Sequence, residues 1–585
     1  MYYPELANRA RSVLTTETFL GYDHNLKTGD GEWYDTTNLS SRAYPLMAQR
    51  EKRGAVRTIA NPGGILGRDA LLWIEDGVLY YNLLSMAAYM PGITLSAGKK
   101  TLVSMGAYVC IFPDKVYFNT ADFSDNGYME RTNAIDAAAA NVKYSICKLD
   151  GTAVTVRYTQ GTVPASPANG DYWLDTSSAA HVLKVWSASS NMWSQVATVY
   201  CKIEAAGIGT GLKKYDGIVL TGCAGTEQVK ALNAAHVLYD VGDNYLVVIG
   251  LLDASYTQAA GTVTAARTVP DMDFVTECGN RLWGCKYGVV GGKTVNELYC
   301  CKLGDFKNWA CYMGISTDAW AASVGSDGVW TGAATMAGSP VFFKENSIHR
   351  VYPSATGAHQ VVELQGRGVQ KGSGASLAVV GEVLYYKARD GVCAYDGSLP
   401  VLVSAALGED RYYEAAGAGC SGLYYVSMRR ADGEWSLFVY DVQRGIWMRE
   451  DSLHAAAFAR IDDELYCLDA DGTLWALRGT VGTAEADVTW ACETGLMGYD
   501  LVEKKYVSRF NLRMRLPEGS SADLWLQYDS SGVWRHAGHL EGRGTGTFLL
   551  PVRPARCDHF RFRLTGRGEI RLYSLARILE RGSDA

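Results

Sequence analysis

FVTECGNRLWGCKYGVVGGKTVNELYCCKLGDFKNW, residues 274–309, contains short apolar segments separated by turns. We expect strands at Phe274–Val275, Arg281–Lys286 and Asn296–Lys302. Gly279-Asn280, a glycine-rich stretch at 288–292 and Gly304-Asp305 supply the breaks between them. Strands with a turn every 8–12 residues or so are typical of sheets built from local hairpins. The stretch therefore predicts an all-β unit of three or four strands.

Similar units recur along the chain on both sides of this stretch. The clearest is Leu71–Asn82, in which an Asp76-Gly77 turn joins two apolar runs. The repeat length is about 35–45 residues, the period of a β-propeller blade. The sequence thus predicts a propeller of about six or seven blades. The other units are Leu102–Asn119, Trp320–Tyr352, Ser376–Val403, Ala415–Met448 and Leu453–Leu477.

The pattern changes at four places, which divide the chain into five parts. Residues 1–60 are expected to form an extended arm with little core of its own, pinned on a neighbour or on the body of the chain. Residues 61–141 are expected to form the first blades. Residues 142–266 are expected to be an inserted small β module or modules, and residues 267–487 the remaining blades. Strict alternation after 488 predicts a C-terminal antiparallel β-sandwich at 488–585, with Leu575–Ala585 as a charged tail.

Composition bounds the class of protein. The apolar runs are far shorter than the roughly 20 residues that cross a bilayer, and the first residues lack a signal-peptide pattern, so we expect synthesis in a cytoplasm and no membrane span. None of the 14 Cys forms a C-x-x-C pair, which favours reduced, buried thiols. His536 and His539 are close in sequence, but neither a metal nor a cofactor is expected.

Charge is unevenly distributed. Residues 501–585 carry 2 Lys and 13 Arg against 9 acidic residues, a net charge of +6, which leaves −13 for the rest of the chain. A basic module can face nucleic acid or an acidic partner. A solvated sheet face covered by arginine stems is the simpler interpretation. The candidate partner-facing or DNA-facing cations are Arg50, Arg53, Arg509, Arg513, Arg515, Arg561 and Arg563.

The insertion holds the other candidate residues. Trp173, Trp186 and Trp193 are expected to be exposed and could stack on a glycan, although a minimal aromatic core is the simpler explanation. Asp171 and Asp175 are the candidate carboxylates for glycan hydrolysis, which needs such a pair. The glycines from Gly207 to Gly211 lack the following helix and Lys-Ser/Thr of a phosphate loop, and so predict a turn.

Four stretches together resemble a known family. They are Asn38–Tyr44 with the basic residues after it, Glu277–Cys285, Lys302–Trp309, and Pro551–Leu564 with the ending Arg577–Asp584. They are similar to the nozzle and packaged-DNA-stabilisation propellers of short-tailed bacteriophages, which lie below the portal and adaptor. The resemblance covers residues 30–130 and 270–585, and the insertion departs from it.

The resemblance implies a virion structural protein of the phage tail rather than an enzyme. It implies a homo-oligomeric ring, often of six copies, that contacts the portal, the adaptor and other tail proteins. Such a ring retains packaged DNA and conducts it, so contact with genomic DNA is transient. An acidic channel wall would suit this passage. The alternative is a tail adhesin that binds the host surface through the tryptophan-rich insertion, and a propeller enzyme is the third hypothesis.

Overall fold

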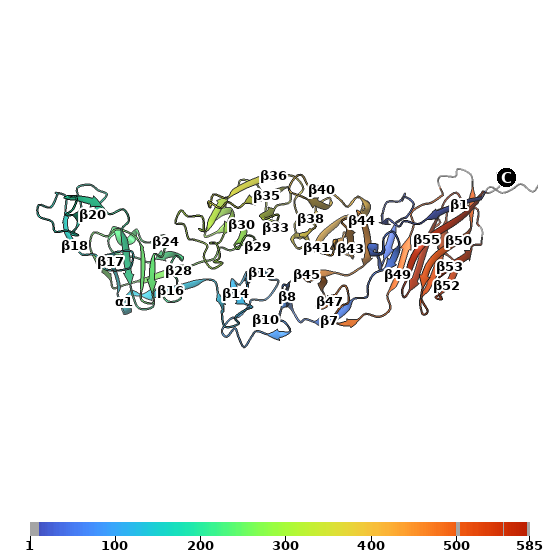
Figure 1. Cartoon of the computed structure of the whole chain (residues 1–585), viewed down its shortest axis with the longest axis horizontal. Helices are drawn as coiled ribbons and strands as arrows, with labels where there is room; N and C mark the ends of the chain where they lie inside the picture. Colours follow the sequence, from blue (N-terminus) through green and yellow to red (C-terminus); the bar gives the residue numbers. More distant parts are fainter. Residues whose placement is uncertain (1–10, 499–503, 554, 582–585) are drawn as a thin grey trace, which may run out of the picture.

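The computed structural model describes residues 11–498, 504–553 and 555–581. This part of the chain is all-β, as predicted, and is built from many small sheets with two single-turn helices, α1 (Ala137–Ala140) and α2 (Glu227–Lys230). The molecule is elongated (Figure 1). The inserted strands lie at one end, the repeated sheets in the middle and the C-terminal strands at the other end.

The stretch at 274–309 forms the expected strands in one antiparallel sheet. They are β29 (Phe274–Glu277), β30 (Leu282–Val290) and β31 (Lys293–Cys300), and β32 (Trp320–Ser323) completes the sheet. β30 runs longer than expected because its pairing with β31 continues to Val290 opposite Lys293. The turn falls on Gly291 and Gly292, whose φ angles of 57° and 80° suit glycine.

Seven sheets of this kind follow one another in the described part of the chain, with the insertion between the second and the third. Six of them have four sequential strands, and the last has five strands. Their first strands are β8 (Pro62–Gly67), β12 (Thr101–Met105), β29, β33 (Gly332–Met336), β37 (Ala378–Val380), β41 (Tyr412–Cys420) and β45 (Ala455–Ile461). The sheets span residues 62–85, 101–128, 274–323, 332–365, 378–402, 412–451 and 455–476.

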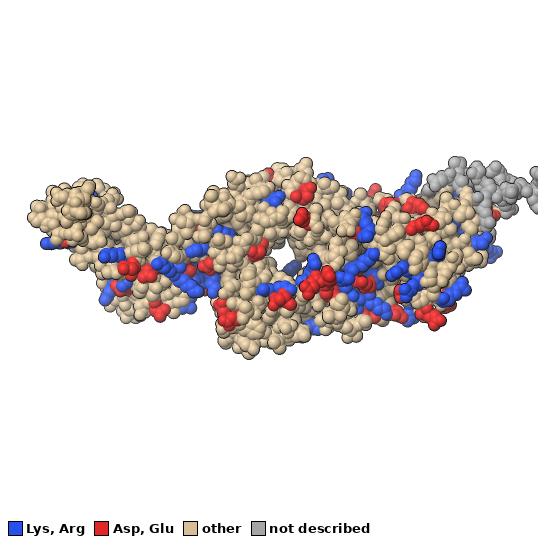
Figure 2. Space-filling view, viewed as in Figure 1, with Lys and Arg blue, Asp and Glu red and all other residues tan. Residues whose placement is uncertain are grey.

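The first strands of these sheets are neighbours around a ring. β8 contacts β12, β12 contacts β29, β29 contacts β33, β37 contacts β41, and β41 and β45 lead back to β8. The 3-10 helix η2 (Gly374–Ser376) bridges β33 and β41. Figure 2 shows an opening near the middle of this region. We call these seven sheets the ring.

Residues before the ring close its last sheet. β7 (Gly54–Thr58) pairs with β47 (Thr473–Ala476) and with β48 (Thr483–Ala484), so segments more than 400 residues apart share one sheet. The described part of residues 1–60 is thus pinned on the body of the chain, and its buried residues share the core of the C-terminal sheets. Trp33, Leu39 and Met47 are buried, because their short strands pack on the C-terminal sheets. Residues 1–10 lie outside the described residues.

The insertion begins earlier than residue 142. Its base is β16 (Arg131–Asp136) paired with β28 (Thr262–Arg267), and β23 (Gly217–Thr221) and β24 (Ala235–Val237) complete that sheet. A second sheet is formed around β17 (Val142–Cys147), β22 (Tyr200–Glu204) and β26 (Tyr245–Ile249), and the two share one apolar core. A small third sheet contains β18 (Val156–Gln160), β19 (Tyr172–Asp175), β20 (Val182–Ser187) and β21 (Met192–Gln195).

Two larger sheets form the C-terminal part and share one core. The first contains β5 (Leu39–Ser40), β6 (Met47–Gln49), β55 (Arg571–Arg581), β50 (Lys505–Leu516) and β53 (Gly544–Pro551), and β1 (Arg11–Thr16) also pairs with β55. The second contains β4 (Asp35–Thr37), β49 (Thr489–Glu493), β54 (Phe560–Arg567), β51 (Ser521–Tyr528) and β52 (Arg535–Glu541).

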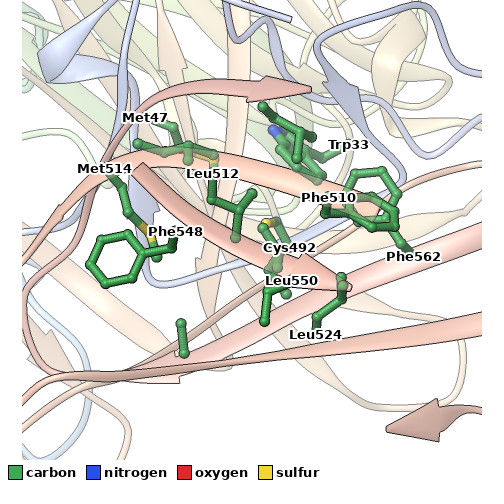
Figure 3. Close-up of a cluster of buried hydrophobic side chains, with 14 of the residues drawn as sticks. Trp33, Met47, Cys492, Phe510, Leu512, Met514, Leu524, Phe548, Leu550 and Phe562 are labelled. Atoms are coloured by element: carbon green, nitrogen blue, oxygen red, sulfur yellow. The ribbon is translucent and has the colours of Figure 1, made fainter. Parts of the chain in front are cut away.

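Alternate side chains of these strands point into the shared core, as Figure 3 shows for Leu512, Leu524 and Phe548. This one-sided burial is what strict alternation predicts for a two-layer arrangement. The expected charged tail at 575–585 is wrong for residues 575–581, because they continue β55 and pair with both β1 and β50. Residues 582–585, which include the end of the Arg577–Asp584 stretch, lie outside the described residues.

Candidate functional site

The three candidate tryptophans form an aromatic cluster in the small sheet of the insertion. Trp193 lies between Trp173 and Trp186, and its ring centroid is 5.4 Å from each in edge-to-face geometry. Trp173 is 2% exposed, and its indole N–H donates to the carbonyl of Gln160 at 2.8 Å. The expectation of three exposed rings is therefore wrong for Trp173. This small sheet needs large rings to build its core, which leaves Trp186 and Trp193 half-buried.

The candidate carboxylates Asp171 and Asp175 are both engaged in ion pairs. Asp171 accepts from Arg157 at 2.7 Å, and Asp175 accepts from Lys184 at 2.8 Å. The hydrogen bonds from Lys184 and Ser177 lower the pKa of Asp175 to about 2. A general acid needs the opposite shift, toward the working pH. Asp175 is therefore poorly suited to act as the general acid of glycan hydrolysis.

Arg50 and Arg53 do not face solvent. They are 8% and 4% exposed and lie in a buried ionic cluster. Arg53 contacts Asp451 at 2.7 Å and Glu450 at 2.9 Å, and Arg50 contacts Glu485 at 2.5 Å. The prediction that these two cations face DNA or a partner is wrong, because their acidic partners, distant in sequence, enclose them.

The C-terminal arginines divide into two groups. Arg561 and Arg563 are half-buried and share the carboxylate of Glu493, the latter at 2.7 Å, so one negative charge offsets part of their positive charge. Arg513 and Arg515 are exposed on the outer face of β50, and Arg509 is half-buried on the same face. Arg515 lies 3.7 Å from Glu569. Part of the predicted basic face is thus present at the surface.

Two pockets lie beside the first strands of the sheets in the ring. Their lining includes Gly63, Gly64, Gly372, Gly374, Ala415, Ala416 and Ala456, together with larger side chains such as Lys99, Phe112 and Trp435. The carboxylates in this lining are paired: Glu414 contacts Arg429 at 2.7 Å and Asp273 contacts Lys286 at 2.8 Å. These contacts place a cation, rather than a second carboxylate, beside each acid.

A polar cluster that sequence reasoning missed is centred on His349 of β35 (Ser347–Tyr352) and includes Glu363 of the paired strand β36 (Gln360–Gln365) and Ser326. His349 is fully buried, and its Nε2 lies 2.9 Å from Ser326 Oγ and 3.4 Å from Glu363 Oε2. A catalytic triad uses both ring nitrogens, one for the nucleophile and one for the carboxylate. Here both partners contact the same nitrogen, so the cluster is not a triad. These residues follow no motif spacing.

This cluster gives a testable pH dependence. Burial, opposed by Glu363 and reinforced by Lys344, lowers the pKa of His349 to about 4. In the unfolded chain the imidazole of His349 takes up a proton near pH 6.5, whereas in the folded chain it stays neutral until about pH 4. The contribution of His349 to the free energy of unfolding is therefore fully present above pH 6.5 and is lost as pH falls toward 4. We expect the stability difference between the native chain and His349→Gln, measured by urea unfolding, to shrink from pH 7 to pH 4.5.

Exposed His539 provides the control for that measurement. Its pKa is raised by Glu541 and Asp523, so its contribution has the opposite sign and is lost as pH rises. A native-minus-variant difference at His349 that stays constant across this range would contradict the assignment of a buried neutral imidazole.

His536 and His539 both lie beside Asp523. No group of His, Cys, Asp and Glu in the described part of the chain is arranged to hold a metal ion.

Two buried side chains from the stretch 280–309, Arg281 and Asn308, form hydrogen bonds with backbone groups of other segments. Arg281, 5% exposed, donates to the carbonyls of Cys301 at 2.7 Å, Asp318 at 2.6 Å and Ser316 at 2.8 Å. Asn308, 1% exposed, accepts from the N–H of Gly217 at 3.1 Å and donates to the carbonyl of Tyr215 at 2.7 Å. The second set of bonds crosses from the ring to the insertion.

Two contact regions therefore join the parts of the chain. At the insertion joint, Asn308 meets Gly217, and Arg267 pairs with Asp216 at 2.6 Å in a buried position. At the C-terminal joint, the cluster of Arg50 and Arg53 lies between the ring strand β44 (Ile446–Asp451) and the short strands β4 and β5. Arg449 on β44 also binds Asp35 on β4 through two hydrogen bonds.

All 14 cysteines are buried and free, as expected. Among the described residues, no helix has the length and apolar character needed to span a membrane.

Comparisons with known proteins add little to this geometry. No family model matches the sequence, and no curated protein matches it. Among solved structures, the chain is similar to an exo-β-1,3-galactanase from Phanerochaete chrysosporium, at 6% identity and a TM-score of 0.21, over 52% of this chain and 94% of that chain. It is also similar to a Trypanosoma rangeli sialidase, at 9% identity and a TM-score of 0.21, over 96% and 95%. Scores this low decide neither blade number nor activity.

Proposed function

We propose that the chain is a structural component of a bacteriophage tail, assembled as a ring of copies below the portal and adaptor. In this proposal, the ring of seven sheets is a seven-bladed β-propeller, and the two C-terminal sheets form a β-sandwich. The neighbouring first strands, the opening in Figure 2 and the closure of the last sheet by β7 support the propeller. The shared core of the two C-terminal sheets supports the sandwich.

One observation supports the structural role: two of the four stretches that resemble the tail family lie at the joints. Asn38 accepts from buried Arg50 and donates to Thr489 at the C-terminal joint. Asn308, from the stretch Lys302–Trp309, makes hydrogen bonds across the insertion joint. Buried polar contacts of this kind favour one relative placement of the parts, because any other placement leaves groups unpaired. A rigid elongated subunit is what a tail component requires.

The state of the carboxylates disfavours an enzyme. Asp171, Asp175, Asp273 and Glu414 each have a cationic partner at 2.8 Å or less. Each carboxyl group in the described residues whose pKa clearly shifts is shifted down, which disfavours a general acid at neutral pH. The buried Trp173 likewise gives no support to the adhesin alternative.

Particles produced without this chain test the proposal. We expect heads that lose their DNA and carry no complete tail, because the channel below the portal stays open. The DNA content of purified heads and electron microscopy of the particles would measure this. Full, stable particles that fail only to adsorb to cells would overturn the proposal in favour of an adhesin.

A further inference from the structure

Five basic side chains gather where the insertion meets the ring: Arg131, Lys213, Lys214, Lys302 and Lys307. Figure 2 shows basic residues concentrated in this region. Lys214 Nζ and Lys302 Nζ lie 5.3 Å and 5.2 Å from the ring centroid of Tyr215, on loops from the two different parts. Arg131 donates to the carbonyl of Thr210 at 3.2 Å, which places it beside the same loop. We call these five cations the joint patch.

The nearby acids do not neutralise the joint patch. Asp216 is 2% exposed and is committed to Arg267 at 2.6 Å and to the backbone N–H of Lys213. Asp305 accepts from the backbone N–H of Lys307 at 3.2 Å, and Asp125 accepts from the hydroxyl of Tyr108 at 2.7 Å. Within the described residues, none of the five cations is within 4 Å of a carboxylate.

The pKa of Lys307 is lowered partly by repulsion from neighbouring cations. Burial makes the largest contribution to the lowered pKa of Lys307, and the positive charges of Lys213 and Arg267 lower it further. The negative charges of Asp125 and Asp305 oppose this shift. The fold thus holds like charges together with no carboxylate of the described residues in direct contact with them. An external anion bound here would relieve that repulsion.

The loop that carries Lys213 and Lys214 is held rigidly. A Cβ on Gly209 would lie 2.1 Å from the carbonyl oxygen of Gly242, and one on Gly217 would lie 2.2 Å from the backbone of Ala310. The expectation of a turn at Gly207–Gly211 fits Gly207 and Gly211, whose φ angles are positive. That turn presents two lysines to solvent, so little conformational entropy is lost when a ligand binds them.

We propose that the joint patch binds the phosphate backbone of a nucleic acid. Its cations come from three separated segments of chain and form a surface rather than an enclosed site, which fits a polymer with repeated phosphates better than one small anion. Tyr215, 38% exposed between two lysines, adds an aromatic edge of the kind that contacts bases and sugars. The assignment rests on these side chains and does not require the tail role proposed above.

Binding to a labelled DNA duplex of about 30 base pairs, followed by fluorescence anisotropy between about 50 and 200 mM salt, tests this proposal. The variant Lys213→Glu/Lys214→Glu should weaken binding at least tenfold, and the slope of log K against log salt should fall by about 2. Lys213→Gln/Lys214→Gln should show a smaller loss in the same direction.

The matched control is Lys143→Glu/Lys148→Glu, which makes the same charge change at exposed positions elsewhere in the insertion. We expect its affinity to stay within about twofold of the native chain. An equal loss of DNA affinity in the Lys213→Glu/Lys214→Glu and Lys143→Glu/Lys148→Glu variants would contradict binding at the joint patch, because net charge alone would then explain the loss. Equal affinity and salt dependence for heparin would overturn the nucleic-acid assignment in favour of anionic polysaccharide. DNA retention by particles is a separate readout, so the tail proposal can fail independently.

Discussion

Replacing Arg53 by alanine is expected to lower the free energy of unfolding by about 3–5 kcal/mol and to uncouple the C-terminal sheets from the ring. Arg53 is 4% exposed and contacts both Glu450 and Asp451. Glu450 is itself 7% exposed, so the substitution would leave a buried carboxylate with one cation fewer. Arg50, which lies 3.8 Å from Glu450, would be left as its one ion-pair partner among the described residues, and breaking a buried pair costs more than removing an exposed one.

Differential scanning calorimetry measures this effect. The native chain should unfold with the ring and the C-terminal sheets coupled, and the Arg53→Ala chain should show an earlier, separate transition. Arg367→Ala is the matched control, because its pair with Asp390 is about half exposed and contributes roughly 0–1 kcal/mol. Equal effects of the two substitutions would contradict a special role for the C-terminal joint.

Arg267→Ala is expected to have a comparable effect at the other joint, with a loss of about 3–5 kcal/mol. Arg267 is 6% exposed, and it pairs with Asp216 and also donates to the carbonyl of Met129. Its removal leaves Asp216 buried without its cation and the Met129 carbonyl without these donors. The base of the insertion, β16 and β28, should therefore open locally.

Limited proteolysis reports that opening directly. Cleavage near residues 129–131 and 267–270 should become faster in Arg267→Ala, whereas Arg157→Ala, which removes an exposed ion pair inside the insertion, should leave the cleavage rate unchanged. If cleavage instead accelerates within the small third sheet and spares the base, Arg267 does not hold the insertion joint.

Local elements were predictable from the sequence because their signals are local. Asp76-Gly77 predicts a tight hairpin turn, and both residues have positive φ, 49° and 75°. Alternation in residues 507–515 likewise predicts the one-sided burial of β50. The closure of the ring by β7 was not predictable, because its partners at 473–476 have no sequence signature of that pairing.

The candidate site was less predictable, because burial depends on distant partners. Arg50 and Arg53 are in a basic run that looks like a surface, yet their carboxylate partners come from residues 450, 451 and 485. The sequence around Trp173 suggests an exposed ring, but in the fold Trp193 from a nearby strand packs against it. The joint patch combines residues 131, 213–214 and 302–307, which only the fold brings together.

The central claim is that rigid joints, rather than catalytic carboxylates, carry the function. The most direct test compares DNA retention in particles assembled with Arg53→Ala and with Asp171→Asn/Asp175→Asn. The account predicts that heads with the Arg53 variant lose DNA on mild heating, and that the carboxylate variant gives full, infectious particles. Full particles with Arg53→Ala, together with assembled but non-infectious particles for the carboxylate variant, would contradict the account.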